Sequence, residues 1–521
     1  MGVPESIRKV PRPVNTVVSD NGKDTVFRYP VRERSRVIYV PGGNPQPRNG
    51  KVIGHIINGE FVALADKTAE KGPDMLSYGG AALFHDVTSD LYSDLLAVYP
   101  ANEAAQIMAI AGLRVIKQGI ASNRLSAHYN RTFISIFYPG AALSQNTVKN
   151  LLERIGMDGK KRKDFFERRL KAVAEDHHLA VDGTLKQDTS TENDLSAFSY
   201  KARVKGCEDI SVLYAYDIEL MEPVCSQVFP GNSIDASSYS SFIRDNNIHK
   251  GIIVADKGFP PSKIREELNN RPDLHFLTPI KRNDTRIKNN QMLDFEGVLK
   301  NTHKHVLYKK CQIQGGNYLY AFRDTSQAGA EEYSYIEKIR TGKEFDKEKF
   351  DKKSPVFGVI VLESDQDLDP ETAYACYEDR WLLELTFRAY KSNECLDRTR
   401  VQGDFTVIGS EFINFISTTA ACRIIRKATR AGILKELSYK EMMDDLNSAW
   451  RTTDGSLTPH SDDGHWVHTL DMVFEELEAL GLSVPAPKPE PKKRGRKPKP
   501  KVDKPKRPRG RPRKNPNPQD L

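Results

Sequence analysis

Two short apolar runs, each followed by an aspartate and then a glycine, most constrain how this chain can fold. The run L-A-V precedes Asp182 and Gly183, and the run I-I-V-A, which begins at Ile252, precedes Asp256 and Gly258. Apolar runs of this length that end near a glycine are typical of buried strands. Either aspartate alone could form a turn or cap a helix, but the repeated design predicts an α/β fold in which two strands each place a carboxylate at their carboxyl end.

A helix is expected from Asp369 to about Lys391. Aspartate caps free backbone N–H groups, and the proline after it suits the first helical position. Four polar side chains then fall within one sector of about 60° on this helix. They are Tyr377, Arg380, Glu384 and Lys391. A solvated face with ion pairs is the simpler interpretation, but the neighbouring apolar residues Trp381, Leu383 and Phe387 indicate the edge of a core.

The chain contains the D-G-T of Asp182, the A-D-K-G-F of Asp256 and the spacing Y-(2)-R-(3)-E-(6)-K from Tyr377 to Lys391. These motifs resemble those of DDE transposases of the insertion-sequence type, which carry a YREK signature. The resemblance extends over roughly residues 175–430. It includes P-G-N followed by D before the second aspartate and F-I-N-F after the signature. It implies an RNase H-like catalytic core that is interrupted by a mainly β insertion domain.

The resemblance also implies a catalytic site made of Asp182, Asp256 and Glu384. Three converging carboxylates repel one another unless cations neutralise them, and Mg²⁺ suits oxygen ligands. Two Mg²⁺ or Mn²⁺ ions are expected, with Asp182 bridging both, Asp256 on one and Glu384 on the other. Such a pair of ions supports phosphodiester hydrolysis and strand transfer.

The rest of the signature is expected to hold DNA. Arg380 and Lys391 would bind phosphates, and Tyr377 would donate a hydrogen bond to another phosphate. Trp381 could stack on an unpaired base or belong to the core. The adjacent His177 and His178 are interpreted as surface residues at a helix end and not as a metal site.

The expected organisation has six parts. These are a small β-rich module at 1–75, a helical region at 76–174 that could bind DNA or form an ordinary bundle, the first part of the core at 175–280, the β insertion at 281–354, the second part of the core with C-terminal helices at 355–484, and a disordered basic tail at 485–521.

The net charge of +8 is concentrated in that tail. Its 37 residues hold fifteen Lys and Arg against three acids, so the tail carries +12 and the rest of the chain −4. Eleven of the 37 residues are proline, and such a segment cannot bury enough apolar area to fold alone. Arg494 and Arg496 lie in R-G-R-K-P, and Arg509 and Arg511 lie in R-G-R-P, which resembles an AT-hook that enters the minor groove of A·T-rich DNA. A solvated basic tail is the alternative.

The six cysteines show no C-x-x-C pair, which fits a reducing compartment, and no apolar run is long enough for a transmembrane helix. We therefore expect a cytoplasmic protein that is nucleoid-associated when on DNA, without a membrane partner. The leading hypothesis is a cut-and-paste DNA transposase that acts as a homodimer on double-stranded DNA, with terminal inverted repeats and target DNA as substrates. The alternatives are an RNase H-like nuclease without strand transfer and an inactive DNA-binding derivative.

Overall fold

The computed structural model describes most of the chain. The described residues are 2–22, 27–38, 46–63, 75–188, 190, 192–199, 206–233, 236–255, 267–342, 344–388, 396–453 and 467–483. Asp256, Lys391 and the tail arginines Arg494, Arg496, Arg509 and Arg511 lie outside these residues. Among the helices of the described part, none combines the length and hydrophobicity that crossing a bilayer requires.

The N-terminal residues form a four-stranded antiparallel sheet with a small core of its own. Its order is β1-β2-β3-β4. The bounds are Thr16–Val18 for β1, Tyr29–Ile38 for β2, Gln46–Ile57 for β3 and Glu60–Ala63 for β4. Val10, Val31 and Ile56 are buried together in this module.

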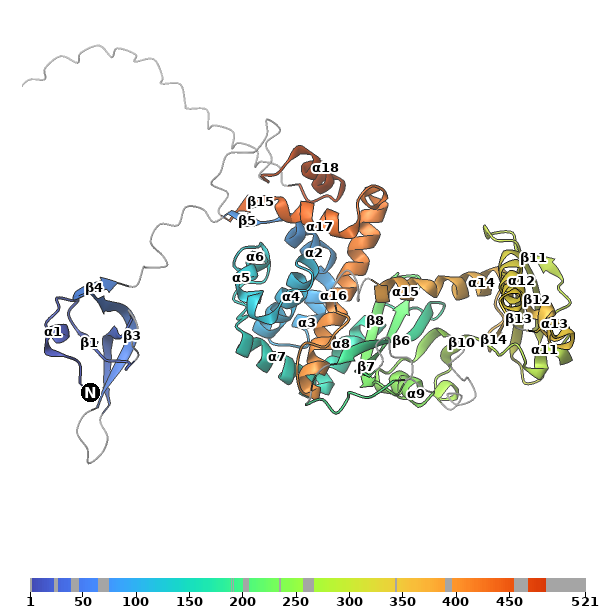
Figure 1. Cartoon of the computed structure of the whole chain (residues 1–521), viewed down its shortest axis with the longest axis horizontal. Coiled ribbons are helices and arrows are strands. Elements are labelled where there is room, and N and C mark those ends of the chain that lie inside the picture. Colours follow the sequence, from blue (N-terminus) through green and yellow to red (C-terminus); the bar gives the residue numbers. More distant parts are fainter. Residues whose placement is uncertain are drawn as a thin grey trace, which may run out of the picture.

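A helical bundle combines segments from both halves of the chain (Figure 1). The early helices are α2 (Gly79–Val87), α3 (Ser89–Leu96), α4 (Ala101–Ile116), α5 (Leu125–Tyr129), α6 (Ile134–Phe137), α7 (Gln145–Met157) and α8 (Gly159–Leu170). The late ones are α16 (Asp404–Arg430), α17 (Tyr439–Ser448) and α18 (Asp471–Ala479). The 27-residue α16 packs against α4, α7 and strand β8 (Glu222–Pro230), so it joins the bundle to the sheet described next.

Close approach of α16 to α7 depends on glycine. A Cβ atom added at Gly409 would lie 1.9 Å from the carbonyl oxygen of Leu152, and one added at Gly156 would lie 1.8 Å from that of Phe405. Any side chain at either position would therefore push the two helices apart.

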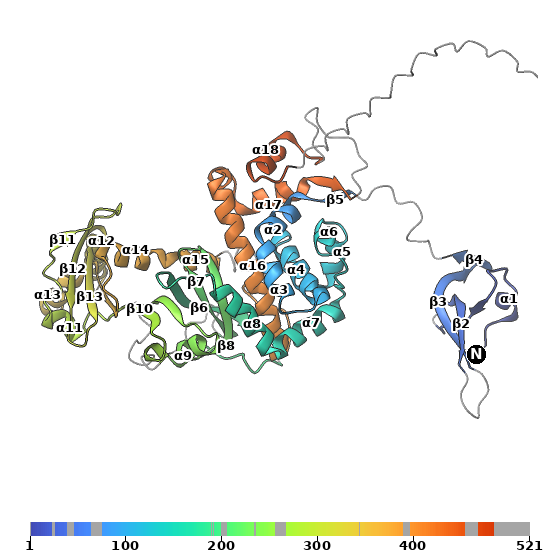
Figure 2. The same cartoon turned by 180° about the vertical axis from the view of Figure 1, so that it is seen from behind.

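A nine-stranded mixed sheet, called the central sheet below, extends from the helical bundle to the lobe that holds β11, β12 and β13 (Figures 1 and 2), in the order β11-β12-β13-β14-β10-β9-β6-β7-β8. The strands not yet bounded are β6 (His178–Asp188), β7 (Glu208–Asp217), β9 (Lys250–Ala255), β10 (Asp273–Pro279), β11 (Gly297–Val298), β12 (Val306–Gln312), β13 (Tyr318–Asp324) and β14 (Val359–Ser364). β6, β9 and β10 run parallel, and the other neighbours are antiparallel. Helix α9 (Ala236–Asp245) connects β8 to β9.

The segment 281–354 differs from the expected insertion domain. Its strands β11, β12 and β13 do not form a sheet of their own but extend the central sheet through β14. The segment also holds helices, namely α11 (Thr285–Asn289), α12 (Thr325–Arg340) and α13 (Lys347–Lys353). A separate small core that includes Met292, Leu319 and Val361 lies on this side of the sheet. The segment is therefore a mixed extension of the central sheet.

Candidate functional site

The signature helix begins as expected but is divided in two. The Asp369 carboxylate accepts hydrogen bonds from the backbone N–H groups of Glu371 (3.0 Å) and Thr372 (3.4 Å), and so caps α14 (Pro370–Asp379). Helix α15 (Trp381–Arg388) follows after one intervening residue, Arg380, whose φ of −52° and ψ of −28° remain helical. The expected single helix is thus interrupted at Arg380.

Asp182 lies within β6, so its expected position at the carboxyl end of a strand is wrong. The antiparallel partner β7 continues to supply backbone hydrogen bonds beyond it, with Asp182 opposite Tyr214 and Gly183 opposite Leu213. The Asp182 carboxylate also accepts a hydrogen bond from the Gly183 N–H at 2.8 Å. On the other side of β6, the described pairing with the parallel strand β9 ends at Val181 opposite Ala255. Asp182 therefore lies next to the end of the described part of β9.

Helix α15 packs over this part of the sheet. The Phe387 ring contacts the ring of Tyr214, with centroids 5.8 Å apart, and Tyr214 is the cross-strand partner of Asp182. At the other end, Tyr374 of α14 packs on Phe322 of β13, with centroids 5.0 Å apart. The two helices therefore lie along the sheet from β13 to β6 (Figure 1).

Arg380 brings two of the expected catalytic acids together. Its Nη1 atom lies 3.9 Å from Oδ2 of Asp182, and its Nη2 atom lies 3.9 Å from Oε1 of Glu384. Both contacts are too long for hydrogen bonds and are ion pairs. The Arg380 side chain is 16% exposed, against 28% for Asp182 and 64% for Glu384, so the guanidinium lies deeper than either carboxylate. In this structure the guanidinium therefore lies beside two acids, and its expected contact with a phosphate stays a prediction.

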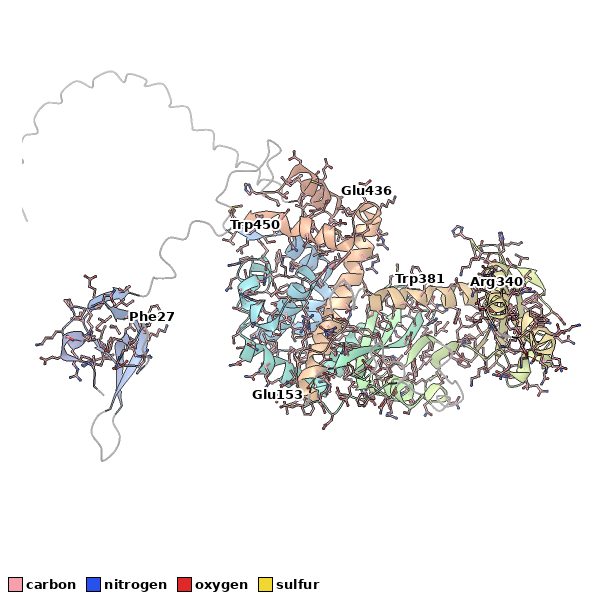
Figure 3. All side chains as sticks on the ribbon, viewed as in Figure 1. Phe27, Glu153, Arg340, Trp381, Glu436 and Trp450 are labelled. Carbon is pink, nitrogen blue, oxygen red and sulfur yellow. The ribbon has the colours of Figure 1, made fainter. Side chains whose placement is uncertain are left out.

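The other described members of the signature flank this group. The Arg380 guanidinium carbon lies 5.5 Å from the ring centroid of the half-buried Tyr377. Trp381 is 49% exposed (Figure 3), so the alternative of a core tryptophan is wrong.

The two histidines at the start of β6 are not surface residues at a helix end. His178 is 5% exposed and its Nδ1 atom lies 2.7 Å from Oε1 of Glu219. The Nδ1 atom of His177 lies 2.7 Å from Oδ2 of the buried Asp217. The sequence prediction failed because the partners come from the end of β7 (Asp217) and from the β7–β8 connection (Glu219), which the adjacent pair of histidines could not reveal.

Some of the basic side chains of α8 make contacts within the protein. Arg162 donates hydrogen bonds to the carbonyl oxygens of Ile155 and Gly156 at the end of α7. Arg169 forms a buried ion pair with Glu222 at 2.8 Å. Lys160 and Lys163 remain exposed. Two of the basic side chains of α8 therefore stabilise the bundle and do not face a partner.

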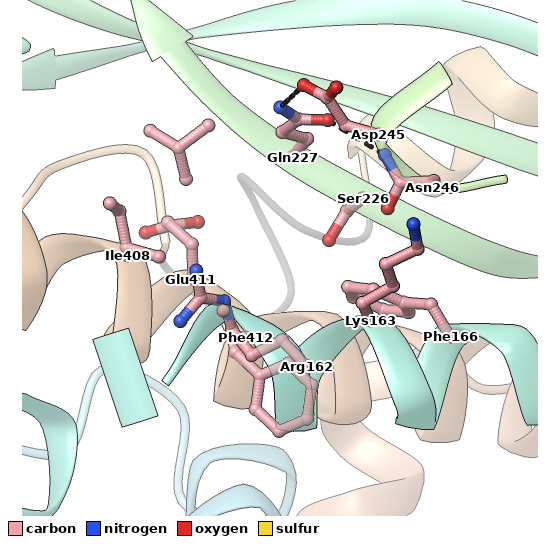
Figure 4. A pocket seen from close by; sticks show the side chains of 12 residues that line it. Arg162, Lys163, Phe166, Ser226, Gln227, Asp245, Asn246, Ile408, Glu411 and Phe412 are labelled. Atoms are coloured by element: carbon pink, nitrogen blue, oxygen red, sulfur yellow. Dashed lines mark hydrogen bonds between the residues drawn. The ribbon is translucent and has the colours of Figure 1, made fainter. Parts of the chain in front are cut away.

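A cavity of about 280 Å³ lies between α8, β8 and α16 (Figure 4). Its labelled lining includes Arg162, Lys163, Gln227, Asp245 and Glu411, and Gln227 donates a hydrogen bond to Asp245 at 3.2 Å. None of the acids contacted by Arg380 lines it. The cavity is therefore separate from the candidate catalytic group.

Part of the chain matches a known protein family. Residues 174–407 match the family model described as Transposase DDE domain. This range contains the β6 acid and the two signature helices described above. The match supports a DNA transposase function and an enzyme of the DDE type.

Two solved structures are similar to parts of the chain. A cryo-EM structure of a piggyBac transposase synaptic complex with hairpin DNA is 11% identical, with a TM-score of 0.39 over 71% of this chain and 80% of that chain. A Mos1 transposase paired-end complex with the left transposon end is 14% identical, with a TM-score of 0.14 over 42% of this chain and 63% of that chain. Scores at this level do not establish a common fold. No curated protein matches the sequence.

Proposed function

We propose that this chain is a cut-and-paste DNA transposase of the insertion-sequence type, with a YREK signature on an RNase H-like core. In this proposal Asp182, Asp256 and Glu384 hold two divalent ions, Mg²⁺ or Mn²⁺. The observation that carries it is the contact of Arg380 with both Asp182 and Glu384, which are distant in sequence and belong to different elements. Acids that share one partly buried cation form a site that a metal ion could also neutralise.

The proposed role of Asp256 is supported by its neighbours, since the residue itself is outside the described part of the chain. Ala255, the residue before it, pairs with Val181, the residue before Asp182. Equivalent positions on adjacent parallel strands lie about 4.8 Å apart. A chain that continued along the β9 direction for one more residue would bring Asp256 beside Asp182.

The donor set fits hard divalent cations, because all three side chains offer only carboxylate oxygens. When bound, two such ions would activate the attacking oxygen and stabilise the leaving oxygen of a phosphodiester. Arg380 would limit the repulsion between Asp182 and Glu384 and bind a phosphate beside them. Tyr377 and Lys391 would contact further phosphates, and the exposed Trp381 would stack on an unpaired base.

The proposed substrates are double-stranded terminal inverted repeats and target DNA, on which a homodimer would hold two ends. The enzyme would act in the cytoplasm, on nucleoid DNA. The tail would add affinity through Arg494, Arg496, Arg509 and Arg511 in the minor groove.

Cleavage of DNA that carries the terminal repeats tests the site. Glu384→Gln should reduce cleavage in Mg²⁺ at least about 100-fold, because losing even an outer partner of a metal ligand costs about 10–100-fold. DNA binding should remain near normal. Glu378→Gln is the matched control, since Glu378 is on the preceding helix α14 and pairs with Lys304 away from the site. Cleavage by Glu384→Gln at the control rate would refute the assignment.

The products separate the alternatives. A transposase yields DNA in which the element end is joined to a target strand, whereas a nuclease yields only cut ends. Cut ends without joined strands would favour the RNase H-like nuclease, and binding without cleavage would favour the inactive derivative.

The tail is tested separately. The double variant Arg509→Ala with Arg511→Ala should weaken binding to A·T-rich DNA and reduce the salt dependence of binding, because fewer phosphate counterions are released. Unchanged affinity and salt dependence would show that R-G-R-P is an ordinary solvated segment.

A further inference from the structure

A cluster of metal-ligating side chains lies at the start of β6, apart from the acids contacted by Arg380. His178 begins β6, Glu219 lies in the β7–β8 connection, and Cys376 belongs to α14. One ligand atom from each of these three residues lies within 4.8 Å of the other two. His177 and Asp217 form an overlapping group with the same Glu219. Three elements therefore converge on one histidine, one carboxylate and one thiol.

The histidine at the centre of the cluster has one ring nitrogen in use and one not. Glu219 accepts hydrogen bonds from the backbone N–H of His178 at 2.8 Å and from its ring at Nδ1, 2.7 Å away. Nε2 of His178 is buried, and no hydrogen-bond partner for it exists among the described residues. Because Glu219 lies at Nδ1, a metal ion that both side chains bind would be at Nδ1, in place of the hydrogen bond between them.

The acids of the cluster have histidines as their basic partners. Among the described residues, neither Asp217, Glu219 nor Asp379 forms an ion pair with a lysine or arginine. Asp379 lies one turn after Cys376 on α14; burial and the nearby Glu219 and Glu378 raise its pKa above the ordinary value. Burial raises the pKa of the Cys376 thiol to about 12, and Glu219 adds to this effect. A bound cation would relieve both the repulsion and the cost of thiolate formation.

We infer that His178, Glu219 and Cys376 bind one Zn²⁺ ion, which ties α14 to the first strand of the central sheet. Imidazole, thiolate and carboxylate together are a zinc-type ligand set, whereas Mg²⁺ prefers oxygen alone. The Glu219 side chain is 35% exposed, so water can reach the remaining coordination position from that side. This site does not depend on the proposed transposase activity.

Cobalt is a direct probe of the site, because Co²⁺ bound to a thiolate gives a characteristic near-ultraviolet absorption band. The full chain, freed of metal with a chelator, should bind one Co²⁺ with this band, and Zn²⁺ should displace it. Cys376→Ser should abolish the band. Cys207→Ser removes a partly buried thiol of another segment and should keep it.

Two further measurements keep the inference falsifiable if Cys376→Ser folds poorly. Glu384→Gln should retain the cobalt band at full intensity, because the proposed catalytic ions occupy another site. Zn²⁺ should also raise the melting temperature of the wild-type chain in a concentration-dependent way. Absence of the band in the wild type, its persistence in Cys376→Ser, or its loss in Glu384→Gln would each overturn the zinc site.

Discussion

Arg380 should have opposite effects on metal binding and on catalysis. Its guanidinium lies 3.9 Å from a carboxylate oxygen of Asp182 and 3.9 Å from one of Glu384. At this distance a unit charge pair is worth about 1 kcal/mol in water and about 4 kcal/mol at an effective dielectric constant near 20. Glu384 is 64% exposed, so the aqueous value applies there, and the partly buried Asp182 lies between the limits. A divalent ion that binds these acids must overcome repulsion from the guanidinium of about 1–2 kcal/mol.

Arg380→Ala should therefore bind Mn²⁺ about 5- to 30-fold more tightly, the factor that corresponds to one or two kcal/mol. Cleavage should nevertheless slow at least about tenfold, because a hydrogen bond from a charged group to a phosphate, worth about 1.5–3 kcal/mol, is lost. Electron paramagnetic resonance of free Mn²⁺ measures the affinity, and cleavage of repeat-bearing DNA measures the rate.

Arg340→Ala is the control for the loss of an arginine, since Arg340 is exposed and pairs with Glu337 within α12. Arg340→Ala should change neither the Mn²⁺ affinity nor the cleavage rate. Weaker Mn²⁺ binding by Arg380→Ala would refute the reasoning, because it would mean that the guanidinium organises the carboxylates for the metal instead of competing with it.

Two predictions concern stability. In urea unfolding, Gly409→Ala should destabilise the chain by about 1–3 kcal/mol or more, because the added Cβ would overlap the Leu152 carbonyl. The control Gly329→Ala, which has open space around it on α12, should stabilise the chain by about 0.5–1 kcal/mol. Equal effects of the two substitutions would contradict the close approach of α7 and α16. Burial raises the pKa of Glu476 from 4.5 to about 7. The folded state therefore holds the proton of the Glu476 carboxyl more tightly than the unfolded chain does. The free energy of unfolding should fall by about 1–3 kcal/mol as pH rises from about 4.5 to 7. Glu476→Gln should remove this fall and the exposed Glu475→Gln should not; the same pH profile in all three proteins would show that Glu476 titrates normally.

The sequence predicted correctly the features that depend on only a few neighbouring residues. Asp369 caps α14, as the Asp-Pro motif predicts. The sequence predicted that β6 ends near Gly183, but the strand continues to Asp188. Its length depends on β7, which pairs with β6 as far as Asp188. The independence of segment 281–354 was misjudged for the same reason, since β13 pairs with β14 through backbone hydrogen bonds that no side-chain pattern encodes.

The two sites share strand β6 and lie on the consecutive helices α14 and α15, and this makes the orientation of Glu384 depend on the histidine cluster. His178 and Asp182 are four residues apart on β6, so their side chains point to the same face about 13 Å from each other. Cys376 and Arg380, which contact the respective sites, are separated by only about 6 Å along the helix axis. The difference is bridged by side-chain length, since it is the end of the long Arg380 side chain that lies near Asp182. A zinc ion bound by Cys376 would fix α14 on the strand, so its removal should alter the rate of cleavage through the position of Glu384 even though no ligand of the catalytic ions is changed.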